Sequence, residues 1–183
     1  MLAQEHPCPN YGHIKHLCMV GYGTIGRALL PLIQTHFSFD HMTIYDSHSL
    51  VASPASPNTT FHRVGLYPDT YQQILDQTVS PNDSMIINVS VCVESTSLIE
   101  YALDKDIFYV DTSCEEWEQE LTEEQKATEE KSNYALREVL KNRVSNHKSH
   151  STVVSSCGCN PGLVSWFLKQ ALINITNGTG FKL

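Results

Sequence analysis

Short apolar runs alternate with stretches of helical periodicity along most of the chain. Residues 16–20 form an apolar run that ends at Gly21, and from Thr24 apolar residues recur every three or four positions, which predicts a strand followed by a helix. Further strands are predicted at 42–45, 61–65, 84–91, 107–110 and 152–155. Further helices are predicted at 69–79, 95–103 and 163–175, with an apolar stripe marking another across 134–140.

Strands that alternate with helices at this spacing predict an α/β fold, a Rossmann-like doubly wound and mostly parallel sheet with right-handed crossovers. We expect a polar lead-in over 1–15, one domain over 16–175 and an irregular tail over 176–183. Ligands of such sheets bind beyond the carboxyl ends of the strands. Five segments should therefore share one rim, namely 21–26, Asp46, 90–92, 111–117 and 157–162.

Composition narrows the possible partners. The 183 residues include 12 Lys and Arg against 20 Asp and Glu, a net charge of −8, which argues against a nucleic-acid partner. No apolar run of about 18 residues is present, so no membrane-spanning helix is predicted. The first 16 residues lack the apolar core of a secretory signal, and the six cysteines are expected to be reduced thiols. These features favour a cytoplasmic location.

The strongest motif is Gly21-Tyr-Gly-Thr-Ile-Gly26, placed between a strand and a helix. Gly21 permits the tight turn, Gly23 lets a pyrophosphate approach the backbone, and Gly26 allows close packing of helix and strand. The amides around Thr24 and Ile25 would then face the anion at the helix N-terminus. The alternative is an ordinary glycine-rich turn.

Asp46 lies about 20 residues beyond the motif, at the end of the next predicted strand. A carboxylate there accepts hydrogen bonds from a ribose 2′-OH and repels a 2′-phosphate, which favours NAD over NADP. Arg27 tempers this preference, because a basic group tolerates a phosphate. Ser90, Asp111 and Thr112, at the ends of two further strands, are also predicted to contact the cofactor.

The segment 111–117 presents Glu115, Glu116 and Trp117 directly after a strand. Carboxylates and an indole face together suit a cationic amine, since cation–π contact contributes about 0.5–2 kcal/mol. The alternative is a helix N-terminus with Trp117 packed as a lid. Asn160, in the loop before the last helix, suits a helix cap and a ligand contact alike.

Cysteine chemistry adds no site. Cys157 and Cys159, with His147 and His150, have poor spacing for zinc, so no metal site is predicted. Cys114 has no base partner visible in the sequence and is assigned to packing. No catalytic acid, base or nucleophile is predicted.

Four segments together resemble homospermidine synthases, within the saccharopine dehydrogenase-like group. They are 20–26 with 30–33, 109–117, 133–138 and the Asn-Pro-Gly-Leu-Val-Ser-Trp-Phe stretch at 160–167, which is the most specific. The resemblance covers about residues 16–175 and implies the N-terminal, cofactor-binding part of such an enzyme. Members are much longer and carry a second domain for substrate binding and dimerisation, so this chain is expected to lack that domain and to be inactive alone.

The resemblance implies NAD-dependent aminobutyl transfer between putrescine-like diamines through an imine, with the hydride taken and then returned. It implies that Glu115 contacts a substrate ammonium, that Asn160 holds another amine, and that the full-length enzyme is a homodimer. Cys92 departs from the polar or acidic residue that members often carry near the substrate.

Two alternatives stay open. A saccharopine dehydrogenase-type oxidoreductase would act on a carboxylate-bearing substrate and want basic residues at the rim, whereas the acidic rim favours amines. A non-catalytic NAD-binding remnant or interaction module would bind cofactor without turnover and expose apolar surface on the helix at 163–175.

Overall fold

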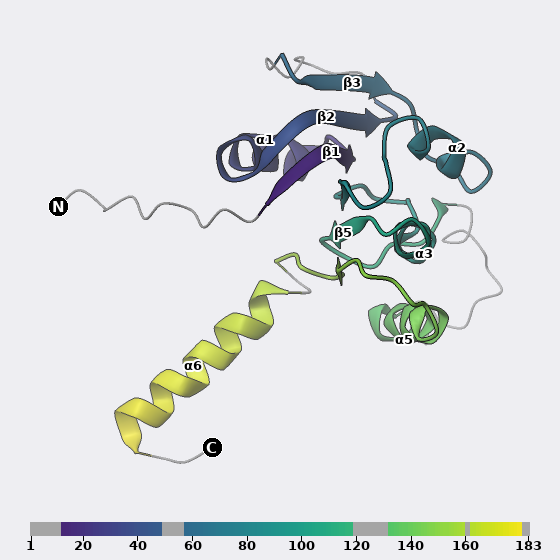
Figure 1. The fold of residues 1–183 in the computed structure, drawn as a ribbon. Helices are drawn as coiled ribbons and strands as arrows, with labels where there is room; N and C mark the ends of the chain where they lie inside the picture. Colours follow the sequence, from purple (N-terminus) through teal and green to yellow (C-terminus); the bar gives the residue numbers. More distant parts are fainter. Residues whose placement is uncertain (1–11, 49–56, 119–131, 160–161, 181–183) are drawn as a thin grey trace.

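The computed structural model describes residues 12–48, 57–118, 132–159 and 162–180, and its centre is a six-stranded sheet (Figure 1). All neighbouring strands pair in parallel, in the order β3-β2-β1-β4-β5-β6. This is the strand order of the doubly wound dinucleotide-binding fold, which confirms the predicted fold class. The strands are β1 His13–Val20, β2 Ser38–Asp46, β3 Thr59–Arg63, β4 Ser84–Asn88, β5 Phe108–Asp111 and β6 Val153–Val154.

Helices lie on both faces of the sheet, as the alternation of side chains along β1 requires. Leu17 and Met19 pack with apolar residues of α1, whereas Cys18 and Val20 belong to the core formed with α2, α3 and Leu140 of α5. The helices are α1 Thr24–His36, α2 Tyr71–Leu75, α3 Ser95–Asp104, α5 Asn133–Val144 and α6 Leu163–Thr179. A parallel sheet covered in this way explains why its central strands are continuous apolar runs.

The first strand begins earlier than the sequence predicted. His13 already pairs with Ser38 of β2, so residues 13–15 belong to the sheet rather than to a polar lead-in. These residues alternate between exposed and half-buried positions, and they precede the apolar run from which the strand was predicted. The polar start of β1 therefore could not be predicted from hydrophobic residues.

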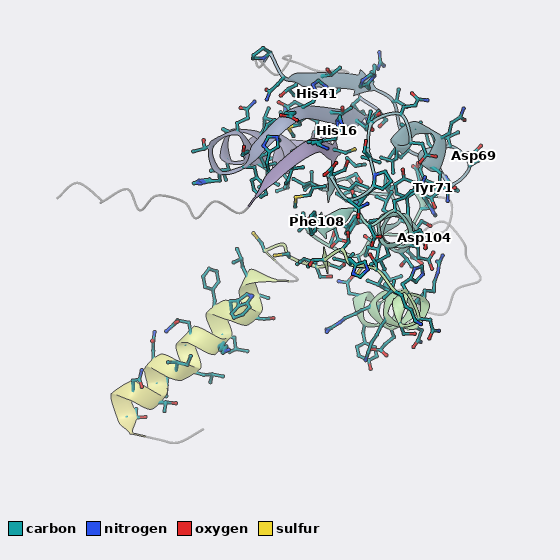
Figure 2. The ribbon with its side chains drawn as sticks, in the orientation of Figure 1. His16, His41, Asp69, Tyr71, Asp104 and Phe108 are labelled. Atoms are coloured by element: carbon teal, nitrogen blue, oxygen red, sulfur yellow. The ribbon has the colours of Figure 1, made fainter. Side chains whose placement is uncertain are left out.

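The last helix stands apart from the sheet (Figures 1 and 2), and none of its residues is buried. Trp166 and Phe167 are 65% and 69% exposed, so the helix carries the exposed apolar surface expected of a remnant or interaction module. The predicted irregular tail from residue 176 is wrong: α6 continues to Thr179 and ends at Gly180, whose φ of 72° is left-handed. None of the described helices has the length and apolar character needed to cross a membrane.

Candidate functional site

The turn after β1 is shaped by two glycines that leave no room for a side chain. Gly21 has a φ of +94°, and a Cβ there would lie 2.6 Å from the backbone nitrogen of Ser90. A Cβ on Gly26 would lie 2.5 Å from the carbonyl oxygen of Gly21. The turn therefore packs against the segment that follows β4, and α1 packs against the turn.

Gly23 differs from these two, because nothing lies within 4 Å of the position its Cβ would take. It is the N-cap of α1, and no side chain caps the helix there. The first helical hydrogen bond runs from the Arg27 amide to the Gly23 carbonyl, at 3.1 Å. The preceding amides, those of Thr24 and Ile25 among them, stand at an open helix N-terminus, where unsatisfied N–H groups and the helix dipole favour an anion.

Asp46 is tied to the glycine turn by its carboxylate. Its Oδ2 accepts a hydrogen bond from the Tyr22 amide at 2.6 Å, and its Oδ1 accepts one from the His48 amide at 2.7 Å. The His48 ring nitrogen Nδ1 lies 3.4 Å from the same Oδ1. An ionised carboxylate has about four acceptor positions, so Asp46 retains capacity for the hydroxyl groups of a ligand.

A cavity of about 420 Å³ joins these groups. It opens between the ends of β1 and β4, the point where the strand order reverses and where ligands of this fold bind. Of the predicted cofactor residues, it brings together Gly21, Gly23, Thr24, Ile25, Asp46 and Ser90. The sequence did not single out further wall residues, among them Ser47, His48, Tyr67 and Glu118.

Ser90 is held in this wall by the buried Asn88. The Oδ1 of Asn88 accepts hydrogen bonds from the Ser90 hydroxyl at 2.6 Å and from the Ser90 amide at 3.2 Å. The Asn88 amide group in turn donates to the Tyr109 hydroxyl at 3.3 Å, and that hydroxyl donates to Asp111 Oδ2 at 3.0 Å. A buried hydrogen-bond chain thus links the cavity wall to the end of β5.

Asp111 is the end of that chain, and its contact with the cofactor stays a prediction. Its side chain is 1% exposed and accepts hydrogen bonds from the Ser155 hydroxyl at 2.9 Å and the Ser156 amide at 2.6 Å. Burial raises the pKa of this carboxyl, although the hydrogen bonds oppose the rise. Asp111 therefore ties β5 to the segment after β6. Thr112 is half-buried and does not line the cavity, so its role stays a prediction.

Two of the three residues in the predicted cation site at 115–117 are buried. Trp117 is 4% exposed and packs in the core with its ring centre 5.7 Å from that of Tyr71, which Figure 2 labels. Glu116 is buried as well. The indole face is therefore covered by protein, which is the packed-lid alternative, and Glu115 is the one member of the three that stays partly exposed.

Glu115 is fixed at the N-terminus of α3. Its amide donates to the Ser95 hydroxyl at 3.0 Å, while the Ser95 amide donates to its carbonyl, also at 3.0 Å. The Ser113 hydroxyl donates to its carboxylate at 2.6 Å. The loop is therefore pinned at both backbone groups, which leaves the carboxylate as the part that can meet a ligand.

The thiol of Cys92, in the cavity wall, is influenced by two carboxylates. Burial is the first cause that raises the pKa of its thiol, followed by the negative charges of Glu118 and Glu115. Cys92 and Glu118 both line the cavity. Glu118 therefore stands in the cavity wall itself, whereas Glu115 does not line it but acts on the Cys92 thiol through its charge. Glu118, directly after the buried Trp117, is exposed.

Asn160 lies outside the described residues, so its predicted role is not tested. Its neighbour Cys157 donates its amide to the Asp111 carbonyl at 2.9 Å, which brings the loop to the carboxyl end of β5. Within the described segments, no three His, Cys, Asp or Glu side chains are grouped so that they could hold a metal ion.

Comparison with known proteins agrees with this geometry. Residues 17–154 match the family described as the saccharopine dehydrogenase NADP binding domain. The chain belongs to this family. Within it, the chain is 36% identical over 169 residues to the homospermidine synthase of Blastochloris viridis and 33% identical over 180 residues to that of Mesorhizobium japonicum. It covers 35% and 37% of those two proteins, while they cover 90% and 95% of the chain.

A solved structure gives the same result. The homospermidine synthase of Legionella pneumophila, in complex with NAD, superposes with a TM-score of 0.75 and 29% sequence identity, over 92% of this chain and 35% of that one. The resemblance drawn from the sequence motifs is thus confirmed. This saccharopine dehydrogenase-type domain is the NAD(P)-binding domain of a homospermidine synthase-like protein, and it spans about a third of the length of those relatives.

Proposed function

We propose that this domain binds NAD and serves the aminobutyl transfer between putrescine-like diamines that its relatives' name suggests. The observation that carries the proposal is the cavity at the strand-order reversal, which combines an open helix N-terminus, a strand-end carboxylate and an acidic rim. Its volume of about 420 Å³ falls within the range of about 300–1,000 Å³ typical of small-molecule sites.

The residues of the cavity fit a dinucleotide. The empty space beside Gly23 admits a diphosphate to the first amides of α1, and Asp46 offers acceptors for ribose hydroxyl groups. Bound NAD supplies a hydride acceptor that becomes a hydride donor. The contribution of this chain is to hold the diphosphate and ribose and to keep the cavity walls in place through the Ser90–Asn88 hydrogen bonds.

The choice of NAD over NADP rests on Asp46. Its carboxylate accepts hydroxyl hydrogens but repels a phosphate, since both are negatively charged. Titration calorimetry with each dinucleotide tests this at neutral pH. We expect NAD to bind at least about tenfold more tightly, a difference of about 1.4 kcal/mol. Tighter binding of NADP would refute the assignment.

The acidic rim supports a cationic substrate. Glu115 and Glu118 stand beside Cys92, and the described part of the cavity wall contains no lysine or arginine. A saccharopine dehydrogenase-type substrate carries carboxylates, which such a wall would repel. We therefore favour a diamine, with Glu115 as its ammonium partner and Asn160 as the partner of a second amine.

Glu115→Gln tests the amine assignment in the NAD-loaded chain. We expect putrescine binding to weaken while NAD affinity stays unchanged, because Glu115 lies outside the glycine turn. Glu138→Gln is the matched control, since Glu138 contacts Lys141 on α5, away from the cavity. Loss of NAD binding in Glu115→Gln would show that the residue's role is misassigned.

The reaction itself is tested by incubating the chain with NAD and putrescine and measuring homospermidine and ammonia. We propose that the chain alone binds NAD without turnover, because it covers only 35% of the Blastochloris viridis protein. Turnover by the isolated chain would contradict this part of the proposal. A homodimeric full-length enzyme in the cytoplasm completes the proposal.

A further inference from the structure

His48 stands next to the carboxylate on which the cofactor choice depends. Its Nδ1 lies 3.4 Å from Asp46 Oδ1, its amide donates to the same oxygen at 2.7 Å, and its side chain is 92% exposed while lining the cavity. The backbone hydrogen bond fixes the position of the His48 main chain relative to Asp46. Imidazole is the side chain that changes charge between about pH 5 and 8.

We propose that His48 sets the discrimination between NAD and NADP as a function of pH, an inference that rests on the proposed function. When the ring is neutral, Asp46 gives the ribose end of the cavity a negative charge that repels a 2′-phosphate. When the ring is protonated, it balances Asp46 and places a cation where a phosphate can use it. NADP is then tolerated, while NAD, which needs only hydroxyl acceptors, is little affected.

The surroundings of His48 include polar and charged residues. Ser47 Oγ lies 3.1 Å from the ring nitrogen, and Arg63 on β3 is the register partner of Asp46. Arg63 is thus a charged residue on the strand next to Asp46. The other charged or titratable groups on elements around this end of the cavity are Arg27 of α1, Tyr67, Cys92 and Glu118.

Arg27 does not serve this purpose. Its Nε donates to the Gly23 carbonyl at 3.3 Å, so the guanidinium lies along the first turn of α1. Glu118 lies with Cys92 at the acidic rim, so its charge acts on the amine side of the cavity rather than beside His48. His48 is therefore the imidazole that lies beside the Asp46 carboxylate.

The test measures dissociation constants for NAD and NADP by titration calorimetry at about pH 5.5 and 8.0. The 2′-phosphate itself gains a proton near pH 6, so part of any change belongs to the ligand. His48→Gln isolates the protein's share. We expect the ratio of the NADP to the NAD dissociation constant to fall on acidification. The fall should be about three- to fivefold larger in the unaltered chain than in His48→Gln, the size expected for one exposed charge pair.

His13→Gln is the matched control, because His13 also pairs with an aspartate, Asp40 at 2.9 Å, but at the opposite end of the sheet. It should behave as the unaltered chain. His48→Lys should tighten NADP binding at both pH values and leave only the pH dependence that the ligand's own 2′-phosphate gives to the ratio. The proposal would be overturned if the ratio of the NADP to the NAD dissociation constant fell equally in His48→Gln and the unaltered chain. It would also be overturned if His48→Lys gained no affinity for NADP.

The outcomes separate this proposal from the one on which it rests. If NAD binds but the ratio follows only the ligand's own titration, His48 has no part in discrimination and the proposed function stands. If neither dinucleotide binds at either pH, both proposals fail. Because the His48 side chain is 92% exposed, its variants should keep the fold, which circular dichroism verifies.

Discussion

Substitutions at Gly21 and Gly23, in the turn after β1, separate an effect on folding from an effect on cofactor binding. Gly21→Ala introduces a Cβ that would lie 2.6 to 2.9 Å from the backbone of Val89 and Ser90, at a φ of +94°. The left-handed conformation costs about 1–2 kcal/mol for an L-residue, and overpacking against backbone adds about 1–3 kcal/mol. We expect a loss of about 2–5 kcal/mol, a large part of the total stability of about 5–15 kcal/mol.

Gly23→Ala is the contrasting change. Its Cβ meets nothing within 4 Å, and the backbone there is extended with a φ of −72°, so stability should fall by no more than about 1 kcal/mol, the size of a poorer N-cap. The methyl group occupies the space through which a diphosphate approaches the amides of α1. NAD affinity should therefore fall about tenfold, or about 1.4 kcal/mol.

Urea unfolding followed by circular dichroism measures the first effect, and titration calorimetry with NAD measures the second. The reasoning is refuted if Gly21→Ala is as stable as the unaltered chain, since the close approach of the turn to β4 would then be absent. It is equally refuted if Gly23→Ala binds NAD with unaltered affinity, because the diphosphate would then lie elsewhere.

Three further predictions concern stability and solubility. Trp117→Ala should lower the free energy of unfolding, measured by urea unfolding, by about 3–5 kcal/mol, because the indole is buried in the core. A change below about 1 kcal/mol would show that the indole is not buried. A hydrogen bond from Lys105, and to a smaller extent one from Tyr101, lowers the pKa of Asp76, so the ionised carboxylate stabilises the fold above about pH 3.8 and this stabilisation is lost as the pH falls through the lowered pKa. Asp76→Asn should therefore make Tm depend less steeply on pH on the acid side. An unchanged acid side of the Tm curve would contradict the pairing. Phe167→Gln with Leu168→Gln should reduce aggregation, measured by light scattering, without lowering Tm, since the two side chains are 69% and 62% exposed; a lower Tm would mean that α6 packs against the domain.

The fold and the cofactor end of the site followed from local patterns in the sequence. The glycine motif specifies a turn that few other residues can adopt, and Asp46 follows at the spacing that a strand-helix-strand unit imposes. Gly21, Gly23, Asp46 and Ser90 are brought to one cavity because the carboxyl ends of parallel strands share an edge. The positions of these residues follow from backbone geometry, and the spacing of residues along the sequence predicts that geometry.

The amine end was harder to predict because burial depends on tertiary packing. Trp117 and Glu116 have the composition of a ligand rim, yet the contact of Trp117 with Tyr71 places the indole in the core. Asp111 has the position of a cofactor residue, but partners that are 44 and 45 residues away in the chain occupy its carboxylate. Glu118 and His48 also line the cavity, and no local sequence motif marks them.

The central claim is that a dinucleotide binds at the turn between β1 and α1, opposite the segment after β4. A nitrogen–proton correlation NMR titration of the chain with NAD tests it residue by residue. We predict the largest amide shifts at Gly23, Thr24, Ile25 and Ser90, with little change along α5 and α6. Shifts confined to α5 and α6, or no shifts at saturating NAD, would contradict the account.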